Sequence, residues 1–158
     1  MTHPSLEELR SWYQGHEKQI LENYVSFLKF RSISTDPAHK EDIRKTAEWI
    51  CERLKKLGFA VDLWKTKGNP VVFGTHLVDP SRPTVLIYHH YDVQPVDPVE
   101  KWKSPPFEPA IKDGYVYARG ASDNKGQCFA TLTALEAVFG ICKKVNLNIK
   151  LFIEGEEE

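Results

Sequence analysis

Residues 84–92 read TVLIYHHYD, and this segment constrains the fold more than any other part of the chain. Its first five residues are apolar, aromatic or β-branched and follow Pro83, which predicts a short strand buried on both faces. Polar side chains begin where that strand ends, with His90 and Asp92. Ligands of open α/β sheets bind beyond the carboxyl ends of the strands, so this segment is the natural place for a site.

Helical patterns stand before and after a group of short strands. Ser5 and Glu8 have capping-box spacing, and apolar residues recur at helical intervals up to Leu28, with Gly15 leaving open one helix or two. The other expected elements are a helix over residues 41–57 ended by Gly58, strands over 59–63, 70–75 and 147–153, and a helix between Asp123 and Gly140. This order predicts a layered α/β domain.

Two connections have recognisable chemistry. Five prolines within residues 94–109 predict an irregular segment stiffened by their fixed φ, for which a cleft wall and a plain surface connection are equally good interpretations. Asp113-Gly114 lies between Ile111 and Tyr115, and this dipeptide predicts a two-residue β-hairpin.

Composition excludes several classes of protein. The 158 residues suffice for one domain with a core, and a net charge of −1 without a basic stripe argues against nucleic acid as a partner. No apolar run approaches the roughly 20 residues of a membrane span, and MTHPSLEELRSW lacks the regions of a secretory signal. Cys51, Cys128 and Cys142 are widely spaced, which argues against a disulfide framework or a cysteine-based zinc site and indicates a cytoplasmic protein.

Ionisable groups follow apolar elements at three places. His90 and Asp92 have period-2 spacing, which suits a metal-ligating imidazole with an orienting carboxylate, although the pair taken alone favours a hydrogen-bonded structural His. Asp123 precedes a helix, where an N-cap is the simplest interpretation. Four carboxylates, Glu154, Glu156, Glu157 and Glu158, follow the last strand.

A cation would explain these groups jointly. Two carboxylates 4 Å apart repel by about 1 kcal/mol in water and about 4 kcal/mol at a semi-buried dielectric, so convergent carboxylates favour a metal ion. Imidazole and carboxylate ligands without Cys suit zinc, and less specifically manganese or cobalt. Paired carboxylates supply a ligand and a general base for water, which points to metal-assisted hydrolysis.

Four ordered motifs also carry a family resemblance: HHYDVQP at 89–95, WKSPPFEP at 102–109, DGYVYARGASDNKG at 113–126 and EGEEE at 154–158. The chain resembles the di-zinc metallopeptidases and amidohydrolases, which include carnosinases, cytosolic dipeptidases, aminoacylases, acetylornithine deacetylases and succinyl-diaminopimelate desuccinylases. The resemblance implies a three-layer α/β domain, a mixed sheet flanked by helices and truncated before its C-terminal strands and helices. Residues 1–158 would be the N-terminal part of the catalytic domain, without the smaller dimerisation or lid domain.

The resemblance also implies roles for five residues. His90 would ligate one zinc, Asp92 would orient His90, Asp123 would bridge two zinc ions, Glu157 would be the general base and Glu158 would ligate the second zinc. The continuation Val93-Gln94-Pro95 looks more like the dipeptidase branch than the deacetylase branch.

The chain departs from the family pattern at two positions and at its end. His89 stands where many members have Gly, and Asn124 where many have Asp, so we expect changed packing there. The chain ends on a ligand motif, which leads us to expect a fragment that binds metal weakly, is inactive alone and associates through an exposed apolar edge.

Three functions follow as hypotheses. The first is a dipeptidase-like exopeptidase acting on small peptides, and the second is an N-acyl amino acid deacylase of the acetylornithine deacetylase or desuccinylase type. The third is a non-catalytic α/β binding module, against which the intact Asp92 and Glu157 count. The resemblance leaves room for a homodimer of the parent protein, with no nucleic-acid or membrane partner.

Overall fold

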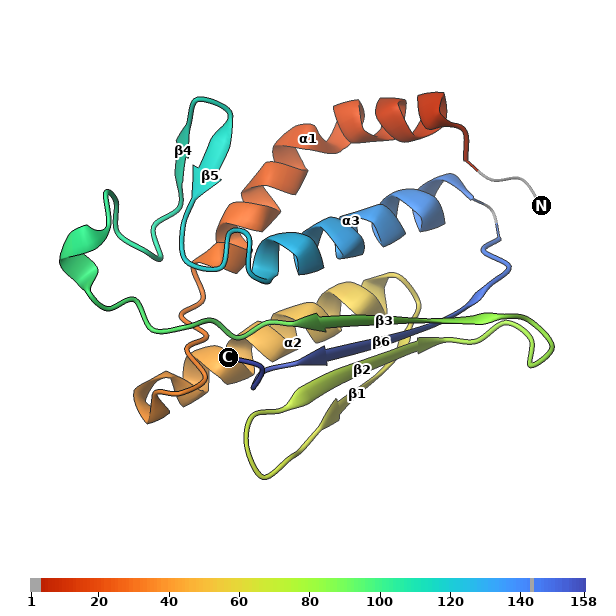
Figure 1. Ribbon diagram of the computed structural model, residues 1–158. Helices are drawn as coiled ribbons and strands as arrows, with labels where there is room; N and C mark the ends of the chain where they lie inside the picture. The colour runs from red at the N-terminus through yellow and green to blue at the C-terminus, as the bar shows by residue number, and fades with distance from the viewer. Residues whose placement is uncertain (1–3, 143) are drawn as a thin grey trace.

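A mixed four-stranded sheet forms the base of the molecule, with the strand order β1-β2-β6-β3 (Figure 1). The computed structural model describes residues 4–142 and 144–158. The central strand β6 runs antiparallel to β2 and parallel to β3, while β1 and β2 are antiparallel neighbours. The strands are β1 (Ala60–Trp64), β2 (Val71–His76), β3 (Thr84–His90) and β6 (Asn148–Glu154).

The three helices agree closely with the sequence patterns, and they are α1 (Leu6–Leu28), α2 (Lys40–Lys56) and α3 (Lys125–Ile141). Ser5 and Glu8 form the predicted capping box, and α1 continues through Gly15 as one helix. Gly58 has a φ of +82° directly after α2, the left-handed conformation that glycine adopts most readily.

The connections also follow their expected chemistry. The hairpin of β4 (Ala110–Lys112) and β5 (Tyr115–Tyr117) turns at Asp113 and Gly114, whose φ angles of 54° and 80° suit a tight primed turn. The proline-rich segment is irregular apart from the short 3-10 helix η2 (Val99–Lys101). A second 3-10 helix, η1 (Pro37–His39), precedes α2.

One hydrophobic core joins all three helices to one face of the sheet. Phe27 of α1, Ile50 of α2 and Leu132 of α3 share this core with Leu151 and Ile153, the inward residues of β6. Figure 1 shows the helices gathered on the same side of the strands. The mixed sheet with flanking helices is therefore the expected α/β class, and the described residues form two of the three expected layers.

The apolar run that begins at Thr84 forms the predicted strand, but the prediction that this strand is buried on both faces is wrong. Strand β3 pairs only with β6 and lies at the edge of the sheet among the described residues. Its side chains Leu86 and Tyr88 are 64% and 51% exposed, on the face away from the helices. An apolar run reports β propensity, whereas burial depends on which strands and helices become its neighbours.

Two further sequence-based expectations concern cysteines and membranes. Cys51 and Cys128 are buried in the core and Cys142 is half-buried. Among the helices of residues 4–142 and 144–158, none has the length and apolar character needed to cross a membrane.

Candidate metal centre

The parallel pairing of β3 and β6 brings two distant parts of the sequence together. His90, the last residue of β3, lies opposite Glu154, the last residue of β6. The Tyr91 amide continues the pairing by donating to the Glu154 carbonyl oxygen at 2.8 Å. Because parallel strands end at the same edge, the residues that follow them share one site.

His90 lies at the centre of this site and is only 5% exposed. Its Nε2 lies 3.1 Å from Asp123 Oδ1 and 3.7 Å from Glu157 Oε2. Its Nδ1 lies 3.3 Å from Asp92 Oδ1 on the other side of the ring, at ion-pair distance but without hydrogen-bond alignment. One ring nitrogen therefore faces a buried carboxylate while the other faces the open side of the site.

Asp92 contacts both halves of the site. It is fully buried, and its second oxygen, Oδ2, accepts the backbone N–H of Glu158 at 3.0 Å. Burying a carboxylate costs free energy unless hydrogen bonds or charges compensate it. The bond from the Glu158 amide offsets part of this desolvation cost at Asp92. One carboxylate thus touches the His90 ring and anchors the backbone of Glu158.

The four terminal glutamates have different environments, which sequence reasoning did not separate. The Glu154 carboxylate accepts the Tyr88 hydroxyl at 2.6 Å on the exposed sheet face. That bond to a carboxylate raises the pKa of Tyr88 well above its usual range. Glu156 accepts the Asn69 amide in the β1–β2 turn at 3.2 Å, so it is directed away from His90. Among the four, only Glu157 and Glu158 reach the ligands at His90.

A tight backbone approach directs these glutamates. A Cβ at Gly155 would lie 2.3 Å from the ring of Tyr91, so only glycine lets the chain pass over that ring. Tyr91 is fully buried and donates its hydroxyl to the Pro70 carbonyl at 2.6 Å, so the ring has no room to move away. Asn69 donates its side-chain amide to the Gly155 carbonyl at 2.7 Å.

Gln94 is a site residue that sequence reasoning missed, although its motif was noticed. Its Nε2 donates to Glu158 Oε2 at 2.8 Å and so orients that carboxylate. The Val93-Gln94-Pro95 motif indicated only a branch of the family. The sequence does not indicate that Asn69 and Tyr88 contact the terminal glutamate segment. The partners of Asn69 lie 86 and 87 residues away, and the partner of Tyr88 lies 66 residues away.

Asp123 is held beside His90 by the loop that precedes α3. The helix N-cap is Asn124, without a side-chain capping bond, so the N-cap interpretation of Asp123 does not hold. The Asp123 side chain is 75% exposed, and its Oδ1 lies 3.1 Å from His90 Nε2. The peptide bond between Asp123 and Asn124 is cis.

Three potential ligands converge. One ligand atom each from His90, Asp123 and Glu158 lies within 4.8 Å of the other two, which is a spacing that one cation could share. Within the described part of the chain, the site carboxylates of Asp92, Asp123, Glu157 and Glu158 form no ion pair with Lys or Arg. One nitrogen and two oxygen donors beside uncompensated negative charge fit zinc, or manganese and cobalt, by the chemistry of the donor set.

The two departures from the family pattern contact each other. His89 Nδ1 lies 2.8 Å from Asn124 Oδ1, and its Nε2 lies 2.9 Å from Thr131 Oγ1. His89 therefore faces α3 while its neighbour His90 faces the site, as expected for alternate strand residues. The two unusual residues therefore contact each other on the face of β3 that packs against α3.

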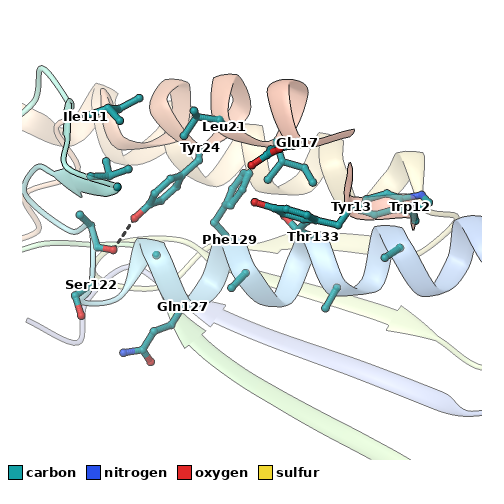
Figure 2. Close-up of a pocket in the computed structure, with 18 of the residues that line it drawn as sticks. Trp12, Tyr13, Glu17, Leu21, Tyr24, Ile111, Ser122, Gln127, Phe129 and Thr133 are labelled. Carbon is teal, nitrogen blue, oxygen red and sulfur yellow. Dashed lines mark hydrogen bonds between the residues drawn. The ribbon is translucent and has the colours of Figure 1, made fainter. Parts of the chain in front are cut away.

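The large cavities lie beside the site and do not contain its ligands. One of about 890 Å³ lies between α1 and α3, next to the β4–β5 hairpin, and Figure 2 shows Tyr24 and Phe129 projecting into it. A second, of about 820 Å³, is lined in part by Lys101, Trp102 and Ser104 of the proline-rich segment. That segment is therefore both a surface connection and a cavity wall.

Comparisons with known proteins agree with this architecture. The Beta-Ala-His dipeptidase of Rattus norvegicus is 26% identical over 98% of this chain and 34% of its own length. The structure of human carnosine dipeptidase 1 superposes with a TM-score of 0.88 at 27% identity, over 96% of this chain and 34% of that one. An M20 family metallo-carboxypeptidase, Sso-CP2 from Sulfolobus solfataricus, has a TM-score of 0.77 and 45% identity over 87% and 31%.

The chain spans about a third of the length of these relatives. The family described as Peptidase family M20/M25/M40 matches residues 86–158, the C-terminal part of the chain. The segment that contains every candidate ligand is therefore similar to the peptidase M20 family.

Proposed function

We propose that the chain forms part of a metal-dependent hydrolase of the dipeptidase type, which cleaves a peptide bond in a small peptide. The observation that supports this most directly is the convergence of His90, Asp123 and Glu158 at the ends of two parallel strands. The names of the relatives, a dipeptidase and a metallo-carboxypeptidase, support a peptide as the substrate.

The proposed roles follow from the donor geometry. His90, Asp123 and Glu158 would hold the metal, with Asp123 shared between two zinc ions in a complete site. Bound zinc lowers the pKa of water and polarises a carbonyl, and manganese or cobalt would serve similarly. Asp92, 3.3 Å from Nδ1, would keep His90 in the tautomer whose Nε2 lone pair faces the site.

Glu157 is the proposed general base. Its carboxylate is 47% exposed and its Oε2 lies 3.7 Å from His90 Nε2, so it can accept a proton at the site without serving as a buried structural group. It would take the proton of the attacking water and pass it to the leaving amine. Glu157→Gln keeps the shape but removes the base, so this change in the active protein that contains this domain should preserve zinc binding and abolish turnover.

The number of ligands limits what the isolated chain can do. Catalytic zinc usually has three protein ligands, and the described residues offer three in all for a site of two ions. We therefore expect the 158-residue chain to bind zinc weakly and to show no efficient hydrolysis of dipeptides. Efficient turnover of β-Ala-His by the chain with added zinc would disprove this expectation.

A calorimetric zinc titration of wild type, Glu158→Gln and Glu156→Gln tests the ligand assignment. Glu158→Gln should weaken binding by at least the tenfold to hundredfold that is typical of changes around a metal site. Glu156→Gln is the matched control, because its carboxylate faces the β1–β2 turn. Equal loss in both variants would show that general negative charge, and no specific site, attracts the ion.

The substrate class has its own test. The active protein that contains this domain should be assayed with dipeptides and with N-acyl amino acids as substrates. Faster hydrolysis of the acylated amino acids would favour the deacylase hypothesis. Cytoplasmic localisation and a homodimer of the parent protein remain predictions.

A further inference from the structure

Asp123 lacks packing of its own to hold it in place. Its side chain is 75% exposed, yet it stays 3.1 Å from the buried His90. Its position must come from the backbone of the Asp123 loop, which we define as residues 120–125. The contacts of that loop therefore decide whether the site is preorganised.

Helix α1 contacts the Asp123 loop through Tyr24. The Tyr24 hydroxyl donates to the Ala121 carbonyl oxygen at 2.6 Å, the dashed line that runs from Tyr24 in Figure 2. Gly126 makes this approach possible, since a Cβ there would lie 2.0 Å from the Ala121 oxygen and 3.0 Å from the Tyr24 hydroxyl. Burial raises the pKa of Tyr24, so the hydroxyl keeps its proton for this bond at neutral pH.

Lys125 connects the other end of the loop to the same helix. Its side chain is fully buried, and Nζ donates to the carbonyl oxygens of Phe30 at 2.6 Å and Phe27 at 3.4 Å. Nζ also lies 5.4 Å from the centre of the Phe27 ring. Its hydrogen-bond acceptors among residues 4–142 and 144–158 are these two carbonyls, and none of them is a carboxylate.

The chemistry of the α1 terminus explains why the buried amino group of Lys125 is placed there. The last carbonyls of a helix lack intrahelical partners, and the last turn of α1 has no basic residue of its own. Burial lowers the pKa of Lys125 to about 7. Its role is therefore that of an N–H donor from α3, which either protonation state supplies.

The stem of Lys125 also packs against the start of the loop. A Cβ at Gly120, which has a φ of +76°, would lie 2.8 Å from Val93 and 3.3 Å from the Lys125 side chain. Val93 directly follows Asp92. Gly120 therefore lies against both Val93 and the Lys125 side chain, so the loop that carries Asp123 packs closely on the strand extension that carries Asp92.

We propose that Tyr24 and Lys125 are positioning residues, which fasten the Asp123 loop to α1 at both ends and so hold Asp123 beside His90. This inference rests on the proposed metal site. Helix α1 contributes no candidate ligand itself, but in this proposal it holds the ligand Asp123 in position.

The test compares zinc affinity and local hydrogen exchange in the 158-residue chain, with zinc alone as the probe. Tyr24→Phe removes one hydroxyl, and Lys125→Met removes the amino group while keeping the stem. Each should weaken zinc binding by about tenfold or more, the usual effect of changing a group that orients a ligand. Each should also speed exchange at the Gly126 and Cys128 amides, which bond to Gly120 and Asn124.

Two matched controls separate positioning from general destabilisation. Tyr13→Phe removes a hydroxyl from α1 beside the same cavity, where Tyr13 is 48% exposed and makes no hydrogen bond among the described residues. Arg53→Met removes another buried basic group, whose partner is Glu136 at 2.7 Å. Arg53→Met should lower stability and leave zinc affinity unchanged.

Wild-type zinc affinity in Tyr24→Phe would overturn the proposal, even if Lys125→Met fails to fold. If the wild-type chain itself binds no zinc, the proposed metal site is refuted instead. In that case the exchange data still decide: unchanged exchange at Gly126 and Cys128 in Tyr24→Phe would show that the loop is not held by α1.

Discussion

The two ends of the β3–β6 pair hold buried polar residues of opposite kinds. At the beginning of β6, Asn148 is 3% exposed and fully hydrogen-bonded. Its Oδ1 accepts the amides of Val78 and Asp79, and its Nδ2 donates to the carbonyls of Asp79 and Arg82. At the other end, His90 Nδ1 and Asp92 Oδ1 are buried without a hydrogen bond among the described residues.

This difference distinguishes a buried polar residue with a purely structural role, Asn148, from the buried pair at the candidate site. Buried polar groups are normally satisfied, and Asn148 shows how completely this fold can do so with four bonds to backbone. At His90, by contrast, the two unsatisfied atoms face each other at 3.3 Å, and the opposite ring nitrogen, Nε2, faces the carboxylates of Asp123 and Glu157. This arrangement is the one that the proposed orienting role of Asp92 requires.

Asn148→Ala should have the largest effect on stability. It removes four hydrogen bonds but leaves three backbone groups without a partner among the described residues, since the Asp79 carbonyl keeps the Arg82 amide. At a typical net value near 1 kcal/mol per bond, the cost is about 3 kcal/mol in the free energy of unfolding. Zinc affinity should not change. Urea denaturation measures the loss, and Asn146→Ala is the control, since that half-buried side chain makes no hydrogen bond among the described residues. A loss no larger than the control's would break the comparison.

Gly155→Ala should damage both properties together. The new Cβ would meet the buried Tyr91 ring at 2.3 Å, and overpacking of this kind costs about 2 kcal/mol of stability. The displaced backbone would also weaken zinc binding at Glu158. Gly15→Ala is the control, because nothing lies within 4 Å of its Cβ and alanine favours the helix. Thermal unfolding and calorimetry together would show whether the two losses occur jointly, and an intact zinc affinity would contradict the close-approach argument.

Asp92→Asn should act mainly on the metal. Losing the charge beside His90 Nδ1 should weaken zinc binding about tenfold or more, or about 1.4 kcal/mol per tenfold. The Glu158 amide can still donate to the remaining oxygen, so stability should change less than in Asn148→Ala. Asp62→Asn, on the exposed strand β1, is the matched control. Undiminished affinity in Asp92→Asn would exclude the orienting role.

Tyr88→Phe should have the smallest effect. The lost bond to Glu154 is solvent-exposed, so screening limits its contribution to about 0.5 kcal/mol. Because the folded pKa of Tyr88 is raised, this stabilisation is complete below the unfolded pKa of about 10 and declines as pH rises beyond it. Denaturation of both proteins at neutral and at strongly alkaline pH measures the difference. A difference that grows with pH would have the wrong sign.

Local signals in the sequence predicted the elements well. The Ser5–Glu8 box, Gly58 and Asp113-Gly114 act over a few residues, and each forms the expected cap or turn. Burial was harder to predict, because β3 has a core-like composition and an edge position. No local pattern reports how many neighbours a strand acquires.

By itself, the sequence determined the helices, the hairpin and the set of residue types that suit a metal, because propensity, capping and donor chemistry are local properties. Only the tertiary structure decided which of these residues meet. The parallel register of β3 with β6 places Glu158 beside His90. Gly155 lets the backbone pass over Tyr91, and after it Glu156 and Glu158 point to different parts of the molecule. Contacts between residues more than sixty positions apart depend on the packing of the whole chain. The segment TVLIYHHYD therefore contributes part of the site, and the pairing of β3 with β6 brings the terminal glutamates to it.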